Sequence, residues 1–173
     1  MKKWLLILML MGLLSGCADP EAYETVSDTL ETATPAKPMQ MILDMPQEAA
    51  QPTLQKESTE KLYHCDGYTL SLQTLAGGDL ERTLKTVTGR GREELTVMQT
   101  LADFGSRYDC VWTAAGETGM QLGRACILED GSYHYVLSVM APEEETGRLQ
   151  ETWQNLFATC RLVDGDKNLN IGS

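Results

Sequence analysis

The sequence predicts an α+β fold in which helices cover an antiparallel meander sheet. Apolar and polar residues alternate in several stretches of the second half of the chain, as in half-buried strands. Short glycine-containing turns separate these stretches, and two other segments carry apolar residues at helical spacing. Turns this short join antiparallel strands, because parallel neighbours need a longer crossover. The helices then bury their apolar stripes against the sheet.

The first predicted elements are a strand at residues 68–75 and a short helix. The strand alternates apolar and polar residues until two glycines interrupt it. The helix has a side chain suited to an N-cap, three apolar residues at i, i+4 and i+7, and a glycine that stops it. These signals are Asp79, Leu80, Leu84, Val87 and Gly89.

Four strands follow as a meander, at residues 95–101, 107–113, 120–128 and 133–140. Asp130-Gly131 is typical of a two-residue hairpin turn, which would pair Leu128 with Tyr133. A three-residue turn at 117–119 would set Cys110 opposite Cys126. With these registers one face of the sheet collects Tyr108, Cys110, Trp112, Cys126, Leu128, Tyr133, Tyr135, Leu137 and Val139.

A longer helix closes the predicted domain. Pro142 and three glutamates open it, since proline suits the first turn and acids suit the positive end of the helix dipole. Its apolar stripe consists of Leu149, Trp153, Leu156, Phe157 and Cys160. We expect Trp153 and Phe157 to cover the sheet face described above, and a short closing strand at residues 161–163.

This order of elements resembles the PsbP-like α/β sandwich, a family that includes lumenal photosystem proteins and bacterial lipoproteins. The resemblance spans residues 68–163 and lies in the helix between Asp79 and Gly89, the meander of residues 107–140 and the helix carrying Trp153 and Phe157. These are packing patterns and not site motifs. The resemblance implies an accessory, assembly or binding protein rather than a catalyst.

The N-terminus has the pattern of an export signal. Lys2 and Lys3 precede an apolar run at residues 4–14, and small residues follow. Leu14-Ser15-Gly16-Cys17 resembles the bacterial lipobox. The resemblance implies cleavage between Gly16 and Cys17 and a diacylglyceryl group on the Cys17 sulfur. A transmembrane anchor is disfavoured, because a run of eleven residues is shorter than the roughly 20 that span a bilayer; an ordinary cleaved signal is the other alternative.

The predicted organisation is a signal peptide at 1–16, a lipidated N-terminus and tether at 17–60, and the sandwich domain with a short C-terminal tail at 61–173. Residues 18–60 hold five of the six prolines, no glycine, nine acids and two lysines, a composition typical of disorder. The methionine-rich patch at 39–45 interrupts this composition. It is either a docking segment for a partner or, as we favour, a sticky piece of linker or a segment that packs loosely on the domain.

The charge excludes one class of partner. Removing the first sixteen residues takes away two lysines and no acid, so the net charge changes from −11 to −13. Nucleic-acid phosphates and anionic lipids repel such a chain. We therefore expect no nucleic-acid partner, and membrane attachment through the lipid alone. This places the protein on the cell membrane, facing outside the cytoplasm.

Four cysteines remain after Cys17: Cys65, Cys110, Cys126 and Cys160. An exported domain with an even number of cysteines permits disulfides, and four cysteines allow three pairings. A bond between Cys65 and Cys160 would tie the two ends of the domain together. The alternative is four buried thiols, since free cysteine is among the most buried residue types.

Metal and catalytic motifs are weak. Neighbours in His64-Cys65-Asp66 point in opposite directions along an extended chain, and the sequence has no paired Cys-x-x-Cys. It also lacks the Gly-x-Ser-x-Gly, phosphate-loop and dinucleotide motifs. His134 is interpreted as an ordinary strand residue. We therefore expect no metal, no cofactor and no enzymatic activity.

The basic residues Arg82, Lys85, Arg90 and Arg92 form a cluster in an otherwise acidic chain. They are either a weak anion site or, as we favour, a solvated helix face balanced by nearby glutamates. Two hypotheses for function follow. One is a non-catalytic binding or accessory module that presents a sheet face or loop to a protein or small ligand. The other is a cell-surface enzyme whose site has no recognisable motif.

Overall fold

A computed structural model describes residues 37–56, 59–117 and 119–164. All of the described residues belong to one compact unit. The predicted signal peptide, the lipidation site at Cys17 and the tether up to residue 36 lie outside the described residues. So does the predicted C-terminal tail from residue 165 onwards.

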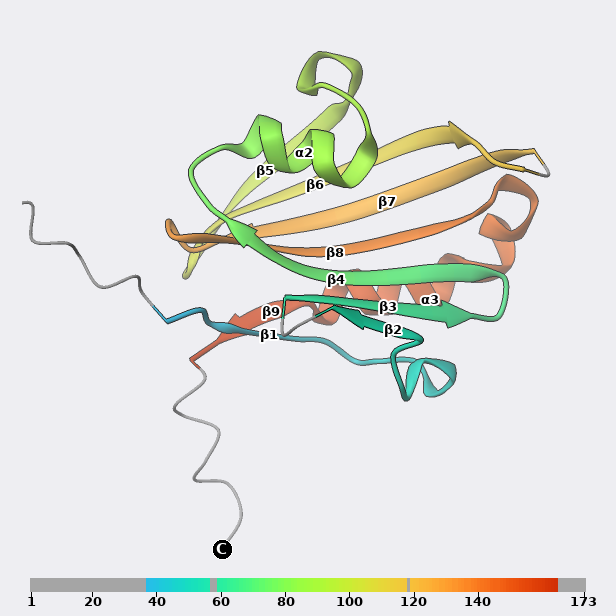
Figure 1. Cartoon of the computed structure of the whole chain (residues 1–173), viewed down its shortest axis with the longest axis horizontal. Helices are drawn as coiled ribbons and strands as arrows, with labels where there is room; N and C mark the ends of the chain where they lie inside the picture. The colour runs from blue at the N-terminus through green and yellow to red at the C-terminus, as the bar shows by residue number, and fades with distance from the viewer. Residues whose placement is uncertain (1–36, 57–58, 118, 165–173) are drawn as a thin grey trace, which may run out of the picture. The chain divides into compact units, whose positions relative to one another are not determined.

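The described chain forms a seven-stranded antiparallel sheet in the order β2-β3-β4-β8-β7-β6-β5 (Figure 1). A second sheet pairs β1 with β9. The strands are β1 (Gln40–Ile42), β2 (Leu54–Lys56), β3 (Glu60–Cys65), β4 (Tyr68–Ala76), β5 (Thr96–Ala102), β6 (Gly105–Ala115), β7 (Met120–Glu129), β8 (Tyr133–Pro142) and β9 (Arg161–Val163). The predicted α+β class, the four-strand meander and the closing strand are therefore confirmed.

Both predicted helices are present. Helix α2 (Leu80–Thr88) begins after Asp79, whose carboxylate accepts the backbone N–H of Arg82 at 2.9 Å. It ends at Gly89, which adopts a left-handed conformation with φ 72° that favours glycine. Helix α3 (Thr146–Thr159) follows a single 3-10 turn, η4 (Glu143–Glu145). Two further 3-10 turns are η2 (Gln47–Ala49) and η3 (Arg92–Glu94).

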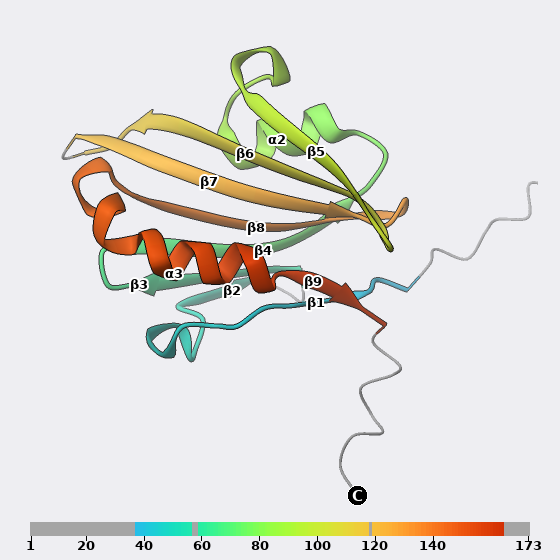
Figure 2. The same cartoon turned by 180° about the vertical axis from the view of Figure 1, so that it is seen from behind.

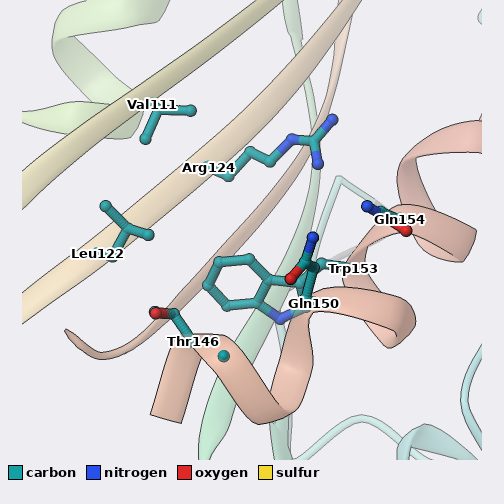
Figure 3. A pocket seen from close by; sticks show the side chains of 8 residues that line it. Val111, Leu122, Arg124, Thr146, Gln150, Trp153 and Gln154 are labelled. Atoms are coloured by element: carbon teal, nitrogen blue, oxygen red, sulfur yellow. The ribbon is translucent and has the colours of Figure 1, made fainter. Parts of the chain in front are cut away.

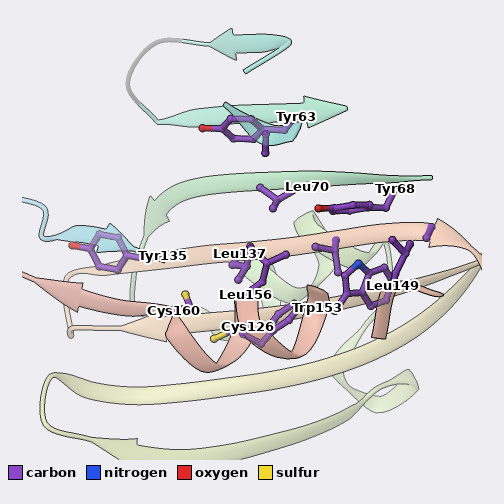
Figure 4. Close-up of a cluster of buried hydrophobic side chains, with 14 of the residues drawn as sticks. Tyr63, Tyr68, Leu70, Cys126, Tyr135, Leu137, Leu149, Trp153, Leu156 and Cys160 are labelled. Carbon is purple, nitrogen blue, oxygen red and sulfur yellow. The ribbon is translucent and has the colours of Figure 1, made fainter. Parts of the chain in front are cut away.

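The helices lie on opposite sides of the sheet and bury two separate clusters (Figures 1 and 2). Under α3 the cluster includes Tyr68, Leu70, Cys126, Leu128, Tyr135, Leu137, Val139, Leu149, Trp153, Leu156 and Phe157 (Figure 4). Under α2 it consists of Leu84, Tyr108, Cys110, Trp112, Ala125, Ile127 and Val136. We call the two faces of the sheet the α3 side and the α2 side, after the helix that lies on each. Strands β7 and β8 contribute alternate residues to both, so they are buried on two faces.

The predicted register between β6 and β7 is wrong by one residue. Cys110 pairs with Ala125 and not with Cys126. The turn holds four residues and not three, and the N–H of Gly116 donates to the carbonyl of Gly119 at 2.7 Å. A slip of one residue moves every side chain to the other face. Tyr108, Cys110 and Trp112 therefore lie on the α2 side, away from Trp153 and Phe157.

The register between β7 and β8 is also shifted, but by two residues. Leu128 pairs with Tyr135 and not with Tyr133. The Asp130 carboxylate accepts the backbone N–H groups of Ser132 at 2.9 Å and Tyr133 at 2.8 Å, which stabilises a longer turn. Because the shift is even, the faces of Leu128 and Tyr135 remain as predicted.

The domain starts earlier than residue 61, so this predicted boundary is wrong. Met39, Met41, Leu43 and Met45 pack against the α3-side cluster. The N–H of Met39 donates to the Tyr135 hydroxyl at 2.7 Å, and residues 40–42 pair with β9. Packing on the domain is therefore confirmed for the methionine-rich patch, whose apolar side chains are partly buried.

Candidate binding groove

Helix α3 covers one half of its side of the sheet. The view in Figure 2 shows α3 in front of β8 and β4, with β5 and β6 outside its cover. Under the helix, Leu70 and Leu137 are fully buried, whereas Met98 on β5 is 65% exposed and Val111 on β6 is 50% exposed. The α3 side thus has a closed half and an open half.

A groove lies where the two halves meet. Between α3 and the strands β6 and β7 there is a hollow of about 350 Å³ (Figure 3). A second hollow of about 290 Å³ continues from it toward β5, and both contain Val111 and Arg124. The floor of the combined groove is Thr96, Met98, Asp109, Val111, Leu122 and Arg124. Its wall on α3 is Thr146, Gly147, Gln150, Trp153 and Gln154.

Strand register determines which side chains form the floor. Val111 pairs with Arg124 on one side and with Thr96 on the other, so the three stand in one row across the sheet. Met98 and Asp109 form the next row along the strands. Paired residues share a face, and Arg124 lies on the same face as its strand neighbours Leu122 and Cys126.

Arg124 is the cation at the centre of the groove. Its guanidinium carbon lies 4.1 Å from the centroid of the Phe157 ring, a cation–π contact that holds the side chain against α3. No carboxylate of the described residues comes within 4 Å of it. In a chain with a net charge of −11, this arrangement offers a preorganised positive group to an acidic ligand.

Strand β5 forms one bank of the groove and is also an edge of the sheet. It is seven residues long and contains no charged residue and no proline. Leu101 is 86% exposed on it. The opposite edge, β2, is three residues long and ends in a lysine. Short or charged edges discourage pairing with another chain; β5 has neither protection.

A polar network on the α2 side has the connectivity of a catalytic triad. The Thr83 hydroxyl lies 2.7 Å from Nδ1 of His134, and Nε2 of His134 lies 3.2 Å from Oε1 of Glu129. The Tyr108 hydroxyl donates to Oε2 of the same glutamate at 2.9 Å. Thr83 is 2% exposed and His134 is fully buried, so the hydroxyl is sealed from any substrate. The network joins α2 to β6, β7 and β8.

The predicted basic cluster does not converge on one site. Arg90 donates to the carbonyl of Thr113 at 2.6 Å and pairs with Glu94 at 3.8 Å. Arg82 and Lys85 are exposed on α2, and Arg92 is exposed in η3. Arg90 is thus held by β6 and Glu94, and the choice between a weak anion site and a solvated helix face stays a prediction.

All four domain cysteines are free thiols in the structure, so the predicted Cys65–Cys160 bond is not formed. The thiol of Cys160 lies near Cys126, whereas Cys65 lies near Tyr68, and in each pair the neighbour shifts the pKa of the thiol. His64 is exposed, and Asp66 pairs with Arg148 at 3.1 Å. Within the described residues, no three His, Cys, Asp or Glu side chains gather in a way that would hold a metal ion.

Sequence reasoning missed the groove. Arg124 is a charged residue that interrupts an otherwise apolar run at residues 122–128, and this break in the pattern is the local signal that pointed to it. The exposure of Met98 and Val111 has no such signal, because it depends on how far α3 extends across the sheet.

No family model and no curated protein matches the chain. Among solved structures, it is similar to LpqN, involved in cell envelope biogenesis of Mycobacterium tuberculosis, with 11% identity, a TM-score of 0.48, and 74% of this chain and 87% of that chain covered. It is also similar to the Ran-binding protein Mog1p of Saccharomyces cerevisiae, with 10% identity, a TM-score of 0.42, and 65% and 83% covered. At these values the likeness is limited to a loosely shared arrangement of elements. The PsbP-like resemblance stays a prediction.

The described part of the chain contains no helix with the length and apolar character needed to cross a membrane.

Proposed function

We propose that the protein is a non-catalytic binding module, held by lipid on the outer side of the cell membrane, and that its groove and β5 receive a protein partner. The observation that carries the proposal is the open half of the α3 side. There an uncharged edge strand adjoins a groove with exposed apolar groups and an unpaired arginine, all among the described residues. Exposed apolar groups that lie together are typical of interaction sites.

The partner chemistry follows from the two parts of the surface. An extended segment that pairs with β5 satisfies the outward N–H and C=O groups of this strand, as in β-augmentation. Side chains of the partner then reach Met98 and Val111, which are 65% and 50% exposed. An acidic group of the partner pairs with Arg124. A short acidic and apolar stretch in extended conformation fits this surface best.

The catalytic alternative has one observation in its favour, the triad-like group of Thr83, His134 and Glu129. A nucleophile must meet its substrate, and the Thr83 hydroxyl lies beneath α2 with 2% of the residue exposed. The groove itself contains no histidine and no cysteine thiol paired with a base. We therefore prefer the binding function.

Site-specific crosslinking in intact cells tests the partner surface. A photo-crosslinking amino acid at Met98 is expected to give a discrete protein adduct in the full-length chain. Leu54, on the opposite edge, is the matched control, because it is 55% exposed and also apolar. A lysine in place of Leu101 blocks strand addition at β5 and is expected to abolish the Met98 adduct. Leu101→Lys leaves the fold intact, since this side chain is 86% exposed.

Two results would overturn the proposed surface. One is the same set of adducts from Met98 and from Leu54. The other is a Met98 adduct that is unaffected by Leu101→Lys and by Arg124→Glu in protein that retains its circular dichroism spectrum.

Lipid attachment is tested separately. Cys17→Ser removes the sulfur that would carry the diacylglyceryl group, so the variant is expected to keep its leader and to incorporate no labelled fatty acid. Recovery of a normally acylated Cys17→Ser protein would contradict the assignment. This result does not depend on which surface the partner uses.

A further inference from the structure

Two of the four domain cysteines lie together in the α3-side cluster. Cys126 stands in the middle of β7 and is fully buried, and Cys160 caps the end of α3 with 4% of the residue exposed. Both sulfurs are visible side by side in Figure 4, between the last turn of α3 and the sheet beneath it. The two thiols are close enough that each shifts the pKa of the other.

The other two cysteines have no thiol neighbour among the described residues. Cys110 belongs to the α2-side cluster, so the sheet separates it from Cys126 and Cys160. Cys65 ends β3, where it pairs with Tyr68 of β4. Of the pairings that four cysteines permit, the fold brings one into contact, Cys126 with Cys160.

Arg107 gives this pair a charged neighbour. Its guanidinium donates to Asp109 at 2.7 and 3.0 Å and to the carbonyl of Phe157 at 3.0 Å, in the last turn of α3. These three bonds fix the cation next to both sulfurs. A hydrogen bond from Cys126, opposed by burial and reinforced by Arg107, lowers the pKa of Cys160. The same hydrogen bond and burial raise the pKa of Cys126. Cys110 differs from Cys160, because burial raises its pKa to about 11.

We propose that Cys126 and Cys160 are a dithiol site that closes to an intramolecular disulfide in an oxidising environment, locking α3 onto β7. The oxidant is a disulfide compound, either a protein or a small molecule. When the last turn of α3 opens locally, the Cys160 thiol loses its proton and the thiolate attacks one sulfur of the oxidant, forming a mixed disulfide and releasing one thiolate. Cys126 then loses its proton and attacks Sγ of Cys160, releasing the second thiolate. Two electrons and two protons pass to the oxidant, which leaves as two thiols.

The bond has a consequence for the groove. Helix α3 provides the wall of the groove and β7 provides part of its floor, so the disulfide fixes the distance between them. It closes a loop of roughly 35 residues. Oxidation therefore holds the open half of the α3 side in one shape. The extracytoplasmic location that we propose supplies the oxidising conditions.

The test uses purified full-length protein in detergent, equilibrated with reduced and oxidised glutathione at defined ratios. Free thiols are then alkylated and an unreduced digest is mapped by mass spectrometry. We expect one crosslinked peptide pair, Cys126 with Cys160, and alkylated Cys65 and Cys110. The oxidised protein is expected to melt about 10 °C above the reduced one. Because the buffer sets the redox potential, the result is independent of where the protein resides and of its partner.

Matched variants separate the site from its neighbours. Cys65→Ser and Cys110→Ser are expected to keep the crosslink and the shift in melting temperature, whereas Cys160→Ser loses both. Four free thiols in folded wild-type protein at the most oxidising ratio would overturn the proposal. A Cys65–Cys160 crosslink would overturn it as well. Both results come from the wild-type chain, so neither depends on whether a variant folds.

Discussion

On one face of β6, Tyr108, Cys110 and Trp112 are 8%, 3% and 5% exposed beneath α2, whereas Val111 on the other face is 50% exposed. These residues alternate along a single strand with one backbone geometry. Their environments differ because α2 reaches across to β6, while α3 stops over β7 and β8. An apolar residue beneath α2 is held by packing, whereas an apolar residue on the open half of the α3 side is left for a partner.

Truncation of neighbouring residues on the two faces gives the largest expected contrast. Trp112→Ala removes a buried ring from the α2-side cluster and is expected to lower the free energy of unfolding by about 3–5 kcal/mol. Val111→Ala removes a half-exposed side chain and is expected to cost about 0.5 kcal/mol or less. Chemical denaturation, fitted with the same m-value for each variant, measures both unfolding free energies. Similar losses for the two variants would show that β6 is covered on both faces.

Two glycine-to-alanine substitutions, one on each side of the sheet, are expected to change the free energy of unfolding in opposite directions. A Cβ at Gly123 would collide with the Trp112 ring, so Gly123→Ala is expected to cost about 1–3 kcal/mol. A Cβ at Gly147, in the groove wall on α3, meets nothing within 4 Å. Gly147→Ala is therefore expected to stabilise the protein by about 0.5–1 kcal/mol, because alanine loses less backbone entropy in a helix. Thermal and denaturant unfolding of the pair check the signs, and two losses would contradict an open groove beside Gly147.

The elements predicted correctly are those with local signals. Asp79 and Gly89 mark both ends of α2, and the stripe from Leu149 to Phe157 marks the buried face of α3. Strands β4 to β8 follow from alternation and from the turns between them. Strands β1 to β3 have weaker alternation and are held by distant residues, as in the bond from Met39 to Tyr135, 96 positions away. Composition alone therefore assigned β1 and β2 to the tether, and no strand was predicted for β3 at the start of the domain.

Strand register was the second feature that could not be predicted correctly from the sequence. The turn at Gly116 holds one residue more than predicted, and this single residue moved Cys110 away from Cys126. The groove could not be anticipated for a related reason. Arg124, Val111 and Met98 come from three strands, and their common face is known only when both registers are known. Cys126 and Cys160 were recognised as candidates for disulfides, but their contact depends on the same registers.

The cation–π contact in the groove is worth less than the core contacts. Arg124→Gln removes the guanidinium from the Phe157 ring and is expected to lower the free energy of unfolding by about 0.5–1 kcal/mol. A double-mutant cycle with Phe157→Leu isolates the pair, since the arginine substitution should cost less when the ring is absent. Equal costs in both backgrounds would mean that Arg124 is not held against α3.

The smallest expected effect is a pH dependence at the turn between β7 and β8. Burial pushes the pKa of Asp130 upward, but hydrogen bonds from the Tyr135 hydroxyl and from the N–H groups of Tyr133 and Ser132 outweigh it, so this pKa lies below its ordinary value. Because this pKa is lower in the folded state, the ionised carboxylate stabilises the fold at pH values above the unfolded-state pKa of about 3.9. This stability is lost as the pH falls through the pKa of the folded state.

Asp130→Asn is therefore expected to destabilise the protein at pH 7 and to have a diminishing effect as the pH falls below about 4. The carboxylate is partly exposed, so solvent screening keeps the electrostatic part of the change below about 1 kcal/mol. Tyr135→Phe removes the hydroxyl that donates to Asp130 at 2.7 Å, and should weaken the same pH dependence. Unfolding free energies measured from pH 7 to pH 3 check both variants. A loss that is constant across this range would assign the role of Asp130 to the shape of the turn and not to its charge.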